Sequence, residues 1–298
     1  MRALFGFLVA FLMLASMPAV AGDVAKTVYI GEKEIDLPLM EGYKEVYGTN
    51  ARFDGLARQL VPPGNRLLGV YLLPEDAQAI KAGTQTAMQR YIIVQTLKDD
   101  ITIKSAADFA AFKGQVLTEA GADFSKNPEA LQQANQISKY IKENYAEDAE
   151  VKVGETKILE AFIDEEKVLG ISMIANIGVQ VGAETRAIPV GLSLLVLDLK
   201  SKPIFATVYT IYSGAKDSDM VKKTGADFAK RMFLVNDEDA PSINAGDKNR
   251  AEEEAEAADD RLSYAMVATG VISVLVLCFF ILVPLIKRLS GGNKDESI

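Results

Sequence analysis

Two apolar segments at the ends of the chain constrain its fold more than any other feature, because they set the boundaries of the folded domain between them. Met1–Ala21 combines a positive Arg2, an apolar stretch over Leu4–Met17 and the small residues Ala19-Val20-Ala21. This pattern is typical of an export signal that is cleaved before Gly22. Since the apolar stretch is short for a membrane span and polar residues follow at once, we expect a signal peptide rather than an anchor.

The second apolar segment, Leu262–Ile286, is a run of 25 residues without a charge. As a helix it would reach about 37 Å, which exceeds the hydrocarbon core of a bilayer at about 30 Å. Lys287 and Arg288 follow directly, whereas the preceding flank is acidic. The positive-inside rule therefore places the tail 287–298 in the cytoplasm. We expect a single-pass protein of the cytoplasmic membrane whose N-terminal domain, residues 22–236, lies outside it.

The exported domain lacks the residues that most often carry chemistry. The chain contains no histidine and no tryptophan, and its one cysteine, Cys278, lies within the expected span. The domain therefore forms no disulfide and must rely on its apolar core. We interpret Cys278 as a packing or lipid-facing thiol rather than a palmitoylation site. The absence of imidazole and thiol groups excludes zinc, Ser-His-Asp and Cys-His chemistry, so we expect no cofactor and name no catalytic, cofactor-binding or metal-binding residue.

Charge separates the domain from the segment that follows it. The chain has 41 acidic and 32 basic residues, and Asp237–Arg261 alone holds ten acidic and three basic ones. We interpret 237–261 as an acidic, Ala/Glu-rich linker, because it cannot bury apolar surface. Its spacing matches no EF-hand calcium loop. No basic surface is expected anywhere outside the membrane, so nucleic acid is not a predicted partner.

Periodicity in the domain predicts helices and antiparallel strands. Apolar residues at 3/4 spacing predict helices at 50–60, 105–118, 128–145 and 220–234, the second beginning at an N-cap Ser105 with Asp108 three residues later. Alternating or β-branched runs predict a hairpin at 27–39, strands at 66–73 and 90–97, and two further hairpins at 150–178 and 186–212. This order predicts an α+β fold with a mainly antiparallel sheet and packing helices.

The order of elements resembles that of PsbP-like domains. Gly42-Tyr43 follows the first hairpin, Arg90–Thr96 precedes the Ser105 helix, and Tyr209–Ser213 runs into a helix over Asp217–Phe233. This resemblance covers most of 27–236 and implies an α/β/α sandwich. Because such domains serve as assembly factors and binding modules, it also implies a non-catalytic role.

Several residue groups are candidate sites, and each also has a structural interpretation. Ser201-Lys202 and Ser125-Lys126 are the available Ser-Lys pairs, but adjacent residues seldom face each other. Asp217-Ser218-Asp219 could hold a hard cation, but we expect it to be the N-cap of the closing helix. Arg90 and Arg186, at strand starts, could clamp an anionic ligand, but we expect them to be surface residues. We expect Asp164–Glu166 and Asp99-Asp100 to be solvated turns. The glycines Gly170, Gly178 and Gly182 lack the spacing of a nucleotide-binding loop.

These observations favour a membrane-anchored, non-catalytic interaction or assembly domain in the periplasm of a Gram-negative bacterium. The expected partner is another membrane or periplasmic protein. Two alternatives stay open. The first is a small-ligand sensor or carrier that signals through a membrane partner, and the second is a hydrolase without histidine that uses carboxylates or a Ser-Lys pair. A deep pocket with converging charges would favour these alternatives over an interaction role.

Overall fold

The computed structural model describes residues 23–239 except 60, 85–87, 122–125 and 145–148. The expected signal peptide, most of the linker, the expected span Leu262–Ile286 and the tail lie outside this part of the chain. Within it, no helix is both long enough and apolar enough to cross a membrane.

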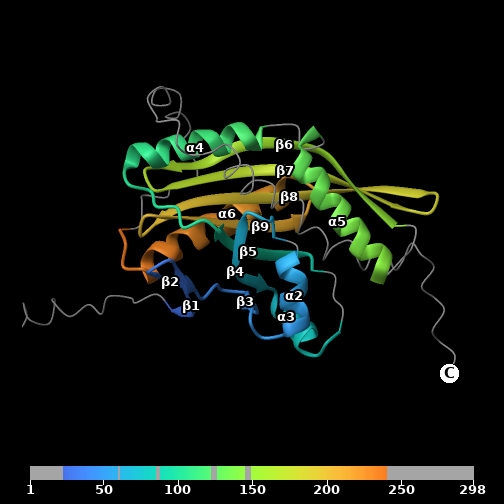
Figure 1. Cartoon of the computed structure of the whole chain (residues 1–298), viewed down its shortest axis with the longest axis horizontal. Helices are drawn as coiled ribbons and strands as arrows, with labels where there is room; N and C mark the ends of the chain where they lie inside the picture. Colours follow the sequence, from blue (N-terminus) through green and yellow to red (C-terminus); the bar gives the residue numbers. More distant parts are fainter. Residues whose placement is uncertain (1–22, 60, 85–87, 122–125, 145–148, 240–298) are drawn as a thin grey trace, which may run out of the picture.

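The described chain forms nine strands and five helices in a fixed order (Figure 1). The strands are β1 (Val24–Ile30), β2 (Lys33–Pro38), β3 (Lys44–Glu45), β4 (Asn65–Leu72), β5 (Arg90–Leu97), β6 (Ala149–Glu165), β7 (Val168–Val181), β8 (Glu184–Leu199) and β9 (Lys202–Ile211). The helices are α2 (Ala51–Gln59), α3 (Pro74–Lys81), α4 (Ala106–Ala120), α5 (Pro128–Asn144) and α6 (Ala215–Val235).

Two residues set the start of α5. Asn127 caps its first turn, since the Asn127 side-chain oxygen accepts a hydrogen bond from the Ala130 amide at 3.2 Å. Pro128 stands at the first position of that helix, where a missing N–H costs nothing. The sequence around 126–130 therefore specifies where α5 begins.

Seven of the strands form one sheet in the order β3-β4-β5-β9-β8-β7-β6, and every neighbouring pair is antiparallel. β1 and β2 form a separate hairpin. Strands β6 to β9 follow one another as a meander, and β9 returns to pair with β5 along its whole length. The expected α+β class, with a mainly antiparallel sheet and packing helices, is confirmed.

Helices cover both faces of the seven-stranded sheet. On one face the core combines α2, α4 and α5 with the sheet, and its members include Phe53, Phe112 and Ile137. On the other face α6 and the β1–β2 hairpin contribute Phe228, Met232 and Leu37, among others. Central strands are buried on both sides, which explains the unbroken apolar run of β5: Tyr91 and Ile93 face one core, whereas Ile92 and Val94 face the other.

Local signals set most of the element boundaries. Ser105 caps α4, because its hydroxyl accepts a hydrogen bond from the Asp108 amide at 3.1 Å, while the Asp108 carboxylate accepts one from the Lys104 amide. This confirms the expected N-cap. The hairpin expected at 27–39 is also confirmed, with Gly31 in its turn at φ 57°. Two elements were not predicted, the short strand β3 and the helix α3.

The two ends of the sheet differ in what meets there. The turns β6–β7 and β8–β9 lie at one end, together with the end of α6, because the last residue of β6 pairs with the first residue of β7. The β7–β8 turn lies at the opposite end, where α5 crosses the first residues of β6 (Figure 1). We call these the exit end and the α5 end.

Candidate functional site

The Ser-Lys pair expected as a remote nucleophile candidate is not assembled. Lys202 is buried, and its ammonium group donates to an Asp100 carboxylate oxygen at 2.5 Å and to the Thr102 hydroxyl at 2.9 Å. Ser201 instead uses its carbonyl to accept a hydrogen bond from the Ile103 amide. Lys202 thus ties β9 to the loop before α4. Ser125, from the other pair, lies outside the described residues.

The acidic turns also have structural partners. Asp100 is half of the Lys202 ion pair, and Asp164 contacts Lys113 of α4 at 2.5 Å. The Lys113 ammonium also donates to the Glu165 carbonyl at 3.0 Å. These contacts fasten α4 to the end of β6, so Asp164 is less solvated than the sequence suggested. Glu166 occupies the expected turn between β6 and β7 and is exposed.

The N-cap expected at Asp217-Ser218-Asp219 is wrong, because α6 begins after Gly214 and Asp217 lies within its first turn. The Asp217 carboxylate accepts hydrogen bonds from the Ser213 amide at 2.7 Å and the Ser213 hydroxyl at 2.6 Å. These hydrogen bonds lower the pKa of Asp217 below its ordinary value. Asp219, the other acid of this group, pairs with Lys222 at 3.0 Å. Within the described ranges, no three histidine, cysteine or acidic residues are arranged to hold a metal ion.

The two strand-start arginines are not brought together. Arg90 pairs across strands with Thr210 on β9 and lies near enough to Asp217 to contribute to its lowered pKa. Arg186 pairs across strands with Val179 beside the β7–β8 turn and forms an exposed ion pair with Glu184 at 3.4 Å. An anion clamp made by both arginines is therefore absent from the described structure.

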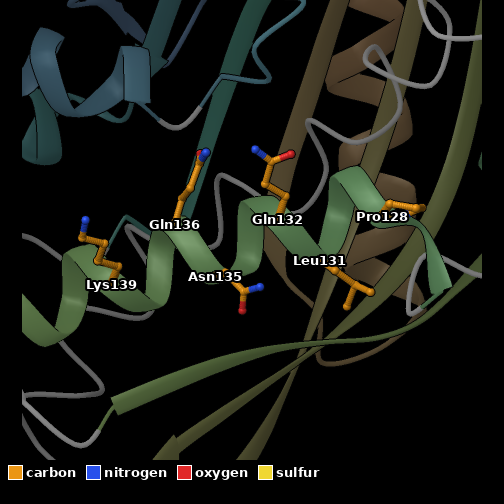
Figure 2. Close-up of a pocket in the computed structure, with 6 residues that line it drawn as sticks. All are labelled: Pro128, Leu131, Gln132, Asn135, Gln136 and Lys139. Atoms are coloured by element: carbon orange, nitrogen blue, oxygen red, sulfur yellow. The ribbon is translucent and has the colours of Figure 1, made fainter.

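The structure instead reveals a surface hollow of about 500 Å³ along α5. Figure 2 shows that its lining side chains form two rows on this one helix, with Gln132, Gln136 and Lys139 projecting from one side and Leu131 and Asn135 from the other. Pro128 closes the series at the start of the helix. Apart from Lys139, these side chains are uncharged. The hollow therefore offers amide donors and acceptors around one apolar side chain, Leu131, which is 43% exposed.

Small residues on the opposite face of α5 hold the helix close to β6. Ala130, Ala134, Ile137 and Ser138 are buried, and they recur at the 3/4 spacing of one helix face. The Ser138 hydroxyl donates to the Ala134 carbonyl at 2.8 Å and accepts from the Val151 amide at 2.9 Å. Because β6 is the outer strand of the sheet, this contact satisfies an edge amide that lacks a strand partner. The same contact orients the hollow outward.

We expect Ser138→Ala to lower the free energy of unfolding by about 1–3 kcal/mol, because it leaves the buried Val151 amide without an acceptor. Thermal unfolding followed by circular dichroism would measure the effect. Lys139→Ala is the matched control, since the Lys139 side chain is 77% exposed and its ion pair with Glu143 spans 3.9 Å. Equal melting temperatures for the two variants would show that Ser138 does not secure α5.

The sequence alone does not identify the hollow. It predicts a polar helix at 128–145, but the residues of that helix give no sign of which face packs on the sheet. A detectable signal was present: Gln132 and Gln136 lie four residues apart, and Leu131 stands beside them rather than in the buried stripe of alanines. A single exposed apolar residue is normal on a protein surface, so this signal by itself does not indicate a binding surface.

No family model matches this chain, and no curated protein matches it. Among solved structures, the chain is similar to the Ran-binding protein Mog1p of Saccharomyces cerevisiae, known from a crystal structure. The two are 12% identical, and the match covers 71% of this chain and 88% of the other, with a TM-score of 0.26. At this TM-score the similarity supports no inference about fold or partner.

Proposed function

We propose that this chain is a membrane-anchored interaction domain that binds a protein partner through the exposed face of α5. The hollow along α5 is the observation that carries this proposal. Its lining comes from a single helix and is open to solvent, unlike the enclosed apolar pockets that bury most of a small ligand. An open surface with an exposed leucine among amide groups suits a partner that brings its own apolar side chain.

The chemistry of the hollow favours binding over catalysis. Lys139 is the one titratable residue that lines it, and its nearest acid in an ion pair is Glu143 on the same exposed helix face. General acid–base catalysis needs groups that converge on a substrate, and a nucleophile needs a base within hydrogen-bond reach. The hollow thus gives no support to the hydrolase alternative, and its openness gives little to a small-ligand carrier.

The location follows from the sequence. The expected export signal and the expected span Leu262–Ile286, with Lys287 and Arg288 after it, support an N-terminal domain outside the cytoplasmic membrane of a Gram-negative bacterium. The partner would then be a periplasmic protein or the periplasmic part of a membrane protein. Helices lie on both faces of the sheet. This layering and the order of elements also support the PsbP-like α/β/α sandwich that the sequence resembles.

Site-specific crosslinking in intact cells tests the proposal. A photoreactive residue at Gln136 is expected to give a discrete protein adduct, whereas one at the exposed Glu32 of the β1–β2 turn is not. Leu131→Arg should reduce the Gln136 adduct at least about tenfold, which corresponds to about 1.4 kcal/mol of binding free energy. The absence of any adduct at Gln136 and its neighbours would contradict the assignment.

Leu159→Arg provides the matched control. Leu159 lies on β6 and is 38% exposed, close to the 43% of Leu131, so both changes place an arginine at an exposed leucine. The adduct should survive the Leu159 change. If both variants lose it equally, the effect is one of charge or folding and the α5 face is not the binding surface.

Truncation after Arg261 should release the domain from the membrane fraction and tests the anchor separately.

A further inference from the structure

The residues that follow α6 are held against the exit end of the sheet by specific hydrogen bonds. Asn236 is buried, and its side-chain oxygen accepts from the Asp36 amide at 2.9 Å. The Asn236 amide group donates to the Asp36 carbonyl and the Met232 carbonyl, both at 2.8 Å. The end of α6 is thereby joined to the β1–β2 hairpin, 200 residues away in the sequence.

Glu238 makes a second set of contacts at the same end. One carboxylate oxygen accepts from the Lys200 amide at 2.6 Å, and the other contacts the Lys167 ammonium group at 2.8 Å. Lys200 and Ser201 form the tight β8–β9 turn, with φ of 52° and 66°, as two-residue hairpin turns require. Glu238 thus bridges the β6–β7 and β8–β9 turns. We call Asn236, Glu238 and these partners the exit latch.

Asp198 lies beside the exit latch and is half-buried at the end of β8. Its amide donates to the Lys167 carbonyl at 2.9 Å, and one of its carboxylate oxygens is buried without a hydrogen-bond partner in the described structure. The charged groups that interact with it are Lys167 from the β6–β7 turn and Glu238 from the segment after α6, and the Ser201 backbone lies beside it. Glu166 interacts with Lys167. Two carboxylates, those of Asp198 and Glu238, therefore interact with the same cation, Lys167, and Glu238 forms the ion pair with it.

We propose that the exit latch, together with Asp198, is a pH-sensitive device that holds the start of the C-terminal segment on the sheet in acid and releases it toward neutral pH. When Asp198 is protonated, Glu238 forms its ion pair with Lys167 without repulsion from a second carboxylate. When Asp198 is ionised, the two carboxylates repel each other and compete for the same ammonium group. This inference goes beyond the proposed partner binding and does not depend on it.

The titration of Asp198 sets the pH range. Burial raises the pKa of Asp198 to about 6, Lys167 opposes this shift and Glu238 adds to it. Because Glu238 helps to raise the pKa, closing the latch and protonating Asp198 favour each other by linkage. The stabilisation is therefore complete below the ordinary carboxyl pKa and is lost as the pH rises through about 6. The whole shift bounds the change in the ratio of closed to open latch at about 100-fold.

Spin-label mobility in the full chain tests the latch. A nitroxide is attached at Asp239→Cys in a Cys278→Ser background, because Asp239 is exposed and adjoins Glu238. Mobility is expected to rise between pH 5 and pH 7, with a midpoint near 6. Asp198→Asn should keep the label immobile across this range, since it removes the titrating group and keeps its shape. Glu238→Gln, which removes the ion pair, should make the label mobile at every pH.

Glu166→Gln is the matched control, because it removes an exposed acid from the same charge cluster without touching the latch bonds. It should retain the pH transition. A wild-type label whose mobility does not change between pH 5 and pH 8 would overturn the proposal, and so would a transition that persists in Asp198→Asn. Circular dichroism of each variant verifies that the fold is intact. If Asp198→Asn does not fold, loss of the transition in Glu238→Gln decides the matter in its place.

Discussion

Replacing Phe228 by alanine is expected to lower the free energy of unfolding by about 3–5 kcal/mol, the range measured for large aromatic side chains removed from cores. Phe228 lies on the buried face of α6 and has no exposed surface. Its ring meets that of Tyr71 edge to face, with ring centroids 5.6 Å apart at an angle of 84°. The change therefore removes both buried area and an aromatic pair that joins α6 to β4.

Chemical denaturation of the chain, followed by far-ultraviolet circular dichroism, measures this loss. Circular dichroism is suitable because the chain contains no tryptophan to report unfolding by fluorescence. Leu234→Ala is the control on the same helix, since Leu234 is 44% exposed, and it should change stability by less than about 0.5 kcal/mol. Similar losses for the two variants would mean that α6 does not bury the face described.

Gly225→Val is expected to destabilise the domain by about 1–3 kcal/mol through overpacking. A β-carbon at Gly225 would lie 2.5 Å from the Ser193 hydroxyl oxygen, closer than two such atoms can approach, with Phe162 and Leu195 next to it. Both Gly225 and Ser193 belong to the contact between α6 and the sheet. The absence of a side chain at position 225 thus lets the helix lie close to β8.

Gly114→Val separates this packing effect from helix propensity. Gly114 lies within α4, and a β-carbon there would meet no atom within 4 Å. Because valine forms helices somewhat better than glycine, this control should be neutral or slightly stabilising. Adding Ser193→Ala to Gly225→Val should recover part of the lost stability. A Gly225 variant as stable as the Gly114 variant would show that α6 is not packed this closely. The melting temperatures of the wild type, the two glycine variants and the double variant provide the comparison.

Features that depend on nearby residues were predictable from the sequence. Ser105 and Asp108 identify the start of α4 within one turn, and the β-branched run of β9 identifies a central strand. α3 carried a signal that was not used, with Pro74 at its first position and Glu75 and Asp76 in its first turn. α6 begins at Ala215, five residues before the expected start, because the Ser213–Asp217 contact extends the helix toward β9.

Features that depend on distant residues were not predictable. The pairing of β5 with β9 joins segments more than a hundred residues apart, as in the hydrogen bond from the Thr96 hydroxyl to the Pro203 carbonyl at 2.8 Å. The hollow on α5 depends on which helix face packs against β6. The exit latch requires Asn236 and Glu238, which the sequence placed at and beyond the domain boundary, to reach strand β2 and two separate turns. Periodicity within one segment carries no information about such contacts.

The separation of the exit end from the α5 end has a consequence for reach. β7 runs between them over 14 residues, and strands rise about 3.3 Å per residue, so the two ends are about 45 Å apart. If the chain is anchored as proposed, the molecule is attached by one extremity and offers its hollow at the other. A partner that stands tens of ångströms above the lipid surface would then meet α5 without any tilt of the domain.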